Sequence, residues 1–192
     1  MIDKNAPSDS FLYHTTLLRN ISSILTDGIQ PPSSSYRDNI DQDLIEVVAE
    51  NGTDLPIDRQ NCVFFYPALG PAASTLTPTN DEGEAVLGKP EGVVVVDETQ
   101  VESDLFVGEF RLISDAIDFQ FREEPDDAMI SASYNDALRR YADSLTLIGA
   151  GNSLETVCEQ FKMPEVIVEG TVGPQTVVSV LCGGHPRIEH YQ

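Results

Sequence analysis

The segment between Phe11 and Gly28 constrains the fold of this chain more than any other part of its sequence. Residues 11–14 have the apolar and aromatic content of a short strand, and the apolar residues that follow recur at helical spacing. Those residues are Leu17, Leu18, Ile21, Ile24 and Leu25. Gly28 then offers a natural helix stop, because glycine adopts the left-handed conformation at little cost. The segment therefore predicts a strand passing directly into a helix, with an imidazole, two hydroxyls and a carboxamide around the junction.

The spacing of these polar residues resembles the N-terminus of ADP-ribosyltransferase-fold proteins, most closely the DarT family of toxins that modify single-stranded DNA. In that family a strand ending in Tyr-His is followed by Thr, Asn and an aliphatic residue, and then by a helix that closes with Asp or Glu before Gly. The matching positions here are His14, Thr16, Asn20, Ile21 and Gly28. A second segment, residues 164–172, is similar to the acidic strand that bears the family's catalytic glutamate.

The resemblance implies both a fold and a substrate site. It implies one domain spanning all 192 residues, with an ADP-ribosyltransferase-like split β-sheet core and flanking helices. It also implies that NAD is bound as a substrate and that His14, Thr16 and Asn20 hold it. Tyr66 would flank the nicotinamide ring, and Arg37, in the connection after the first helix, would face the pyrophosphate.

The same resemblance maps the catalytic glutamate onto Glu165, where an extended segment begins. Its carboxylate would stabilise the oxocarbenium-like charge that develops when the bond between nicotinamide and ribose breaks, and would accept the proton of the incoming nucleophile. Glu169 has the same parity along that strand and remains an alternative acidic residue. By resemblance the acceptor is a macromolecule such as a base of single-stranded DNA, and the context is a toxin with its antitoxin, or phage defence.

Each of these residues also has a purely structural interpretation. His14 can be a half-buried histidine satisfied by the backbone, Thr16 a helix cap and Tyr66 a core aromatic. The family's arginine-containing segment after the next strand has no counterpart in residues 65–70. That departure leaves two alternatives open. One is a catalytically inactive binding or regulatory module of the same fold, and the other is an RNA 2′-phosphotransferase-like enzyme, which would need several basic residues around its site.

The charge of the chain points to its environment. A formal net charge of −21 accompanies only three lysines, Lys4, Lys89 and Lys162. The acidic residues are scattered along the chain rather than gathered in one tail, which predicts an acidic solvated surface. At molar salt the Debye length falls to about 3 Å, so the self-repulsion of such a surface is largely screened. These features favour the cytoplasm of a halophilic organism, and the alternative is an acidic mesophilic protein that binds cations or basic partners.

Several classes of protein lack support in the sequence. No charged and apolar leader opens the chain, and no apolar run approaches the roughly 18 residues needed to span a bilayer, so we expect a soluble, intracellular protein without a membrane partner. Phosphate-binding glycine loops, nucleophilic serine motifs and metal-ligand spacing of histidines are missing. A basic stripe for nucleic acid is missing too, although the attraction it would supply is weak in molar salt.

The remaining periodicity predicts an α+β protein. Strands are expected at residues 62–66, 93–96, 105–112, 166–168 and 176–181. Helices are expected at 134–148 and 153–161, and a short helix is expected around 43–50 inside a long connection. A second connection is expected over 71–90, and residues 116–121 are expected to extend the sheet. Because the strands do not alternate regularly with helices, this order favours α+β over a doubly wound parallel sheet.

Overall fold

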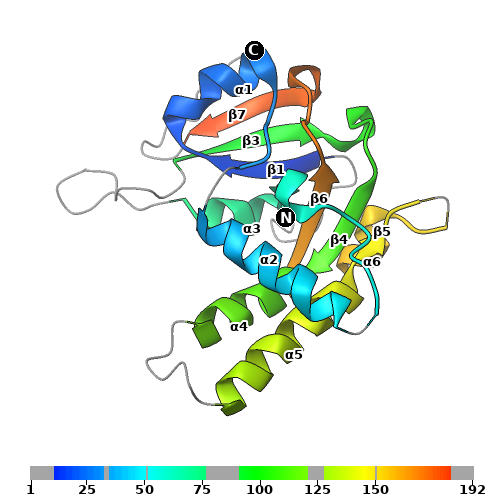
Figure 1. Cartoon of the computed structure of the whole chain (residues 1–192). Helices are drawn as coiled ribbons and strands as arrows, with labels where there is room; N and C mark the ends of the chain where they lie inside the picture. Colours follow the sequence, from blue (N-terminus) through cyan, green and yellow to red (C-terminus); the bar gives the residue numbers. More distant parts are fainter. Residues whose placement is uncertain are drawn as a thin grey trace. The chain divides into compact units, whose positions relative to one another are not determined.

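The computed structural model describes residues 11–32, 35–50, 52–76, 91–120, 128–149 and 151–182 (Figure 1). Helices and antiparallel strands occur together, so the predicted α+β class is confirmed. Contacts between residues divide the chain into two compact units. The first unit comprises the described residues of 1–30, 63–103 and 170–192, and the second those of 31–62 and 104–169.

The first unit is built on a three-stranded sheet in the order β1-β3-β7, in which both pairs of strands are antiparallel. The division between the units falls within strand β2 (Cys62–Phe65): Cys62 belongs to the second unit, and the last three residues belong to the first. The other elements of the first unit are β1 (Phe11–Thr16), η1 (Leu18–Asn20), α1 (Ile21–Asp27), α3 (Leu69–Ser74), β3 (Gly92–Asp97), η3 (Glu98–Gln100), η4 (Pro174–Thr176) and β7 (Val177–Cys182).

Strand β3 is the centre of that sheet because its sequence suits burial on both faces. Its four consecutive valines, residues 93–96, are all buried, and β-branched side chains pack well on a pleated surface. Antiparallel pairing sets Leu12 of β1 opposite Val96, and His14 opposite Val94. This register fixes where the polar end of β1 lies within the unit.

Helix α1 ends at Gly28 for a reason the sequence indicates only in part. Gly28 has a φ of +83°, and a Cβ added there would lie 2.3 Å from the carbonyl oxygen of Val172. The next residue, Ile29, exchanges two backbone hydrogen bonds with Val172, with N···O distances of 2.8 and 3.0 Å. Glycine is therefore required both by the backbone angle and by the close approach of the segment before β7.

The second unit combines an antiparallel sheet, in which β4 pairs with both β5 and β6, with a group of helices. Helix α5 packs against α4, against α2 and against strand β4. The elements of this unit are α2 (Ser35–Ala49), η2 (Arg59–Asn61), β4 (Leu105–Glu109), α4 (Phe110–Gln120), α5 (Ala128–Ser144), β5 (Thr146–Leu147), α6 (Leu154–Cys158) and β6 (Pro164–Glu169).

Four of the expected elements differ from the structure. The expected strand over 105–112 ends at Glu109, and the expected extension of the sheet over 116–121 is wrong, because residues 110–120 form helix α4. Helix α2 spans 15 residues where only a short helix around 43–50 was expected. Helix α5 ends at Ser144, so the last residues of the expected helix over 134–148 include strand β5.

The remaining expected elements agree with the structure in kind. The strands near 62–66, 93–96, 166–168 and 176–181 are confirmed, as is a helix inside 153–161. Ser153 caps that helix by accepting a hydrogen bond from the backbone N–H of Thr156. The first six residues of the expected connection over 71–90 contain the end of helix α3, and residues 77–90 lie outside the described residues.

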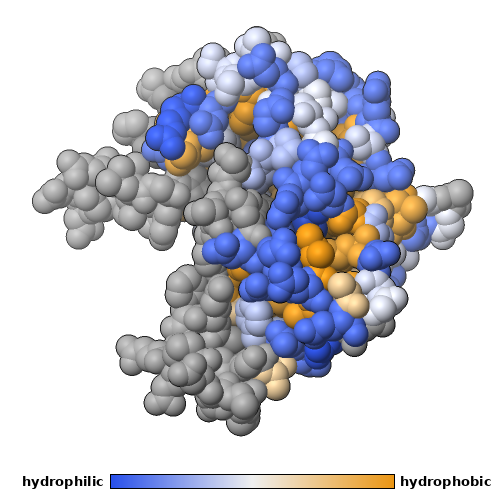
Figure 2. All heavy atoms as spheres, viewed as in Figure 1, coloured by the Kyte–Doolittle hydropathy of each residue, from blue (hydrophilic) through white to orange (hydrophobic). Residues whose placement is uncertain are grey.

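The surface of the described residues is mainly hydrophilic in the view of Figure 2, with apolar residues gathered in the area of β5 and α6. Leu147 of β5 is 47% exposed and contributes an apolar group there. Among the helices of the described residues, none combines the length and the apolar character needed to cross a membrane.

Candidate functional site

His14 lies where β1 meets the segment that ends β2. Its Nδ1 is 3.0 Å from the carbonyl oxygen of Phe64, and its ring makes an edge contact with the ring of Phe65 at 5.7 Å between centroids. A carbonyl oxygen can only accept, so Nδ1 carries a hydrogen and donates this bond. The histidine is half-buried. The hydrogen bond at Nδ1 and the contact with Phe65 fix the orientation of the imidazole ring.

Thr16 and Asn20 contact each other across the start of the helical segment. Asn20 Nδ2 donates to Thr16 Oγ1 over a long distance of 3.4 Å, and Thr16 is buried while Asn20 is exposed. Thr16 is not the helix cap: the cap positions of η1 and α1 are Leu17 and Asn20, and neither side chain accepts a capping hydrogen bond from the helix backbone. The backbone N–H of Leu18 instead donates to Glu91 Oε2 at 3.0 Å, a partner that the sequence analysis missed.

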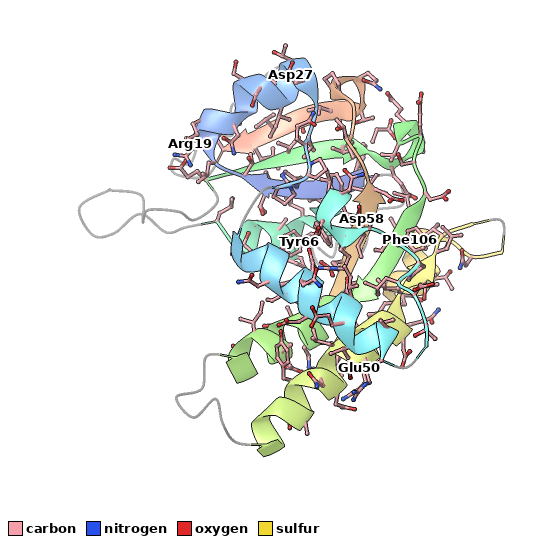
Figure 3. The ribbon with its side chains drawn as sticks, in the orientation of Figure 1. Arg19, Asp27, Glu50, Asp58, Tyr66 and Phe106 are labelled. Atoms are coloured by element: carbon pink, nitrogen blue, oxygen red, sulfur yellow. The ribbon has the colours of Figure 1, made fainter. Side chains whose placement is uncertain are left out.

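Tyr66, labelled in Figure 3, follows β2 directly and exchanges backbone hydrogen bonds with Tyr13, at 2.8 and 3.0 Å. Its side chain is partly buried and packs against an apolar cluster formed by Tyr13, Ala72, Val93 and Val95. The structure therefore places Tyr66 beside the strand that carries His14, within the first unit. Its packing is that of an aromatic at the rim of the core.

The acidic candidates of strand β6 lie in the second unit and differ sharply in burial. Glu165 is buried, with 6% of its surface exposed, whereas Glu169, at the end of the strand, is exposed. The backbone of Arg37 lies in helix α2 of the same unit, and its side chain lies outside the described residues. The structure thus distinguishes the two glutamates by their burial, which the sequence alone could not do.

Glu165 belongs to a buried cluster of charged and polar side chains, which we call the Glu165 cluster: Asp41, Arg59, Tyr141 and Glu165. Arg59 Nε donates to Asp41 Oδ1 at 2.8 Å, and Arg59 Nη1 donates to Glu165 Oε1 at 3.2 Å. The Tyr141 hydroxyl donates to the same Oε1 at 2.6 Å and contacts Arg59 Nη1. The guanidinium carbon lies 4.7 Å from the centroid of the Tyr141 ring. One arginine therefore joins two buried carboxylates and stacks on the aromatic ring.

Burial and charge act on the cluster in definite directions. Burial raises the pKa of Tyr141 well above its usual range, and the nearby charge of Glu165 raises it further, so the hydroxyl stays protonated and donates. Burial by itself lowers the pKa of Arg59, but the charges of its partners outweigh that effect and raise it overall. Arg59 therefore stays a cation between Asp41 and Glu165. Its charge offsets the free-energy cost of removing these two carboxylates from water.

The local backbone prepares this cluster. Asp58, labelled in Figure 3, precedes Arg59, and its backbone carbonyl oxygen accepts a hydrogen bond from Cys62 Sγ at 3.0 Å, which links η2 to the start of β2. Gly108 of β4 is paired directly with Glu165. A Cβ at Gly108 would come within 3.2 Å of both the Tyr141 ring and its hydroxyl. The missing side chain of Gly108 leaves the space in which Tyr141 reaches Glu165.

The sequence analysis selected Glu165 but none of its partners. Signals for two of them were present. Asp41 falls on the apolar face of α2, among Ile40, Leu44 and Val48, where a charge requires a partner. Tyr141 lies on the apolar face of its helix, and a buried tyrosine hydroxyl usually finds a hydrogen-bond acceptor. Arg59 had no such signal, because its burial depends on contacts distant in sequence.

Comparison with protein-family models, curated proteins and solved structures finds no match to this chain. Function is therefore inferred from its residues and their contacts. Within the described part of the chain, no group of three or more His, Cys, Asp or Glu side chains is placed to hold a metal ion.

Proposed function

We propose that this chain transfers ADP-ribose from NAD to a macromolecular acceptor, with an ADP-ribosyltransferase-like split-sheet fold and Glu165 as its catalytic carboxylate. The observation that carries the proposal is the environment of Glu165. The residue that matches the family's catalytic glutamate is a buried carboxylate held at one oxygen by Tyr141 and Arg59. Glu169, four residues further along the same strand and of the same alternation, is exposed and has the environment of a surface charge.

The proposed transfer of ADP-ribose requires a buried carboxylate for two tasks, the stabilisation of charge and the acceptance of a proton. When the bond between the nicotinamide nitrogen and C1′ of ribose breaks, its electron pair leaves with nicotinamide, and positive charge develops on the ribose ring. An ionised Glu165 stabilises that charge more strongly in a site of low dielectric than in water. The acceptor nucleophile then bonds to C1′ and gives up its proton, which the carboxylate accepts and passes to solvent.

The junction after β1 supplies a second support. His14 has a ring fixed by the Phe64 carbonyl, and an imidazole held by the backbone in this way is suited to hydrogen-bond a ribose hydroxyl. Thr16 and Asn20, joined by a hydrogen bond, lie on the same stretch of chain. Tyr66, at the end of β2, provides an aromatic ring of the kind that stacks on nicotinamide. Arg37, by resemblance alone, would face the pyrophosphate. A DarT-like activity would use a base of single-stranded DNA as the acceptor, in a toxin with an antitoxin or in phage defence.

One observation favours a second candidate, a non-catalytic binding or regulatory module of the same fold. The Glu165 side chain is only 8% exposed, and Arg59 and Tyr141 both contact it. A carboxylate so enclosed can serve purely to hold α5 and η2 against β6. The two candidates differ in one measurable respect, the cleavage of NAD.

The proposal is tested by incubating the purified protein at molar KCl with NAD labelled in the adenylate part, in separate reactions with single-stranded DNA, RNA and protein. We expect label to appear in one acceptor class. Glu165→Gln should abolish the transfer, since the amide keeps the shape of the side chain but neither carries the charge nor accepts the proton.

Glu169→Gln is the matched control, because it makes the same change on the same strand at an exposed position. It should retain the activity of the wild type. Equal transfer by wild type and Glu165→Gln would remove Glu165 from the chemistry. Absence of transfer to every acceptor, together with no effect of NAD on the melting temperature, would leave the binding module as the function.

A further inference from the structure

The two hydrogen bonds that reach Glu165 within the described residues both fall on Oε1. Tyr141 Oη donates to this atom at 2.6 Å and Arg59 Nη1 at 3.2 Å. A carboxylate has two equivalent oxygens in solution, and this arrangement makes them inequivalent. Oε1 is held by the protein, while Oε2 takes no part in the hydrogen bonds between described residues.

Tyr141 is the more directional of the two donors. Its bond is the shorter, and its ring is fully buried, with the guanidinium of Arg59 over the ring and Gly108 near its hydroxyl edge. A side chain packed in this way keeps one rotamer, so the position of its hydroxyl group is fixed. Arg59, by contrast, donates to Asp41, to the Tyr141 hydroxyl and to Glu165, and supplies mainly charge.

The surroundings of Glu165 contain few other charges. The groups that face it from the elements packed against β6 are Arg59 from η2 and Tyr141 from α5, with Asp41 of α2 behind the arginine. Strand β4 presents Gly108, which has no side chain, directly opposite. No other described side chain is thus in a position to orient this carboxylate by a hydrogen bond.

We propose that Tyr141 is the positioning residue for Glu165: it fixes Oε1 and so directs Oε2 at the ribose and at the proton of the acceptor. This inference rests on the function proposed above. Catalytic groups need supporting contacts that hold them within a fraction of an ångström of the productive geometry. Gly108 takes part by leaving room for the tyrosine ring.

The test is a double-mutant cycle on NAD cleavage, measured as nicotinamide release at molar KCl. The variants are Tyr141→Phe, Glu165→Asp and the two combined. Tyr141→Phe removes only the hydroxyl, and Glu165→Asp keeps the charge but withdraws the carboxylate by one methylene. We expect Tyr141→Phe to lower kcat by about tenfold to one-hundredfold, the range for a hydrogen bond to a charged group, with KM for NAD nearly unchanged.

The decisive quantity is the interaction between the two changes. If Tyr141 acts through Glu165, Tyr141→Phe will lower kcat much less in the Glu165→Asp background than in the wild type. Tyr134→Phe is the matched control, because this tyrosine of the same helix donates to Asp43 of α2, outside the Glu165 cluster. It should leave kcat unchanged.

The outcomes separate this inference from the function on which it rests. A wild type that cleaves no NAD overturns both. An active wild type with a fully active Tyr141→Phe variant, or with strictly additive effects, overturns the positioning of Glu165 and leaves the function intact. If Tyr141→Phe does not fold, Gly108→Ala replaces it, because the added methyl group crowds the Tyr141 hydroxyl and should lower kcat in the same non-additive way.

Discussion

Arg59 lies between two buried carboxylates, and its removal would take away an ion pair from each of them. Its side chain is 3% exposed and bonds to Asp41 and Glu165. Whether such a cluster stabilises a protein relative to an apolar core is a separate matter, since desolvation of the charges offsets their attraction. Breaking it by removing a single partner is different, because the remaining charges stay buried.

We therefore predict that Arg59→Met lowers the free energy of unfolding by about 3–5 kcal/mol, as for other buried ion pairs that lose one partner. Chemical denaturation at constant molar KCl measures this difference. Arg140→Met is the control: Arg140 pairs with Asp136, but both side chains are about two-thirds exposed, at 65% and 64%, and the change should cost less than about 1 kcal/mol. Equal effects of the two substitutions would show that the Glu165 cluster is not an energetic unit.

At the scale of elements, the sequence predicted most strands well, but it continued the sheet into the residues of helix α4 and predicted only part of helix α2. Four consecutive valines leave little choice for β3. In α4, Leu112, Ile113 and Ala116 are buried at helical spacing, but the apolar β4 residues just before them suggested that the strand continued. In α2, acidic and amide residues are interspersed with the buried stripe of residues 40, 44, 47 and 48, and this obscured the helical period. Local pattern alone could not show where a strand gives way to a helix.

The end of helix α1 offers a test at this scale. Gly28→Ala should lower the free energy of unfolding by more than 2 kcal/mol, about the cost expected when left-handed strain is joined by a clash. Gly170→Ala separates the two contributions, because Gly170 has nearly the same φ, +81°, but no atom within 4 Å of an added Cβ. It should cost only the strain, about 1–2 kcal/mol. A Gly28→Ala variant no less stable than Gly170→Ala would contradict the close contact with Val172.

Over the whole molecule, charge is the property that the sequence made plainest. The formal net charge is −21, and the described surface in Figure 2 is mainly hydrophilic. The candidate site was less accessible to sequence. Glu165 could be proposed from a motif, whereas Asp41, Arg59 and Tyr141 lie 124, 106 and 24 residues away from it and meet only in the folded unit. Long-range pairing of this kind leaves no local periodic trace.

The excess of negative charge leads to a prediction about salt. The melting temperature should rise steadily as KCl increases from about 0.1 M to 1 M, because the Debye length shrinks from about 10 Å to 3 Å and screens the self-repulsion of the surface. Thermal unfolding followed by circular dichroism measures it. A melting temperature that does not change across this series would argue against an adaptation to concentrated salt.

The most direct test of the account is whether purified protein releases nicotinamide from NAD at molar KCl, with wild type compared to Glu165→Gln. The account predicts release by the wild type and none by the variant, with both proteins folded by circular dichroism. Release that is equal in the two proteins, or absent from the wild type under every acceptor condition, would contradict it.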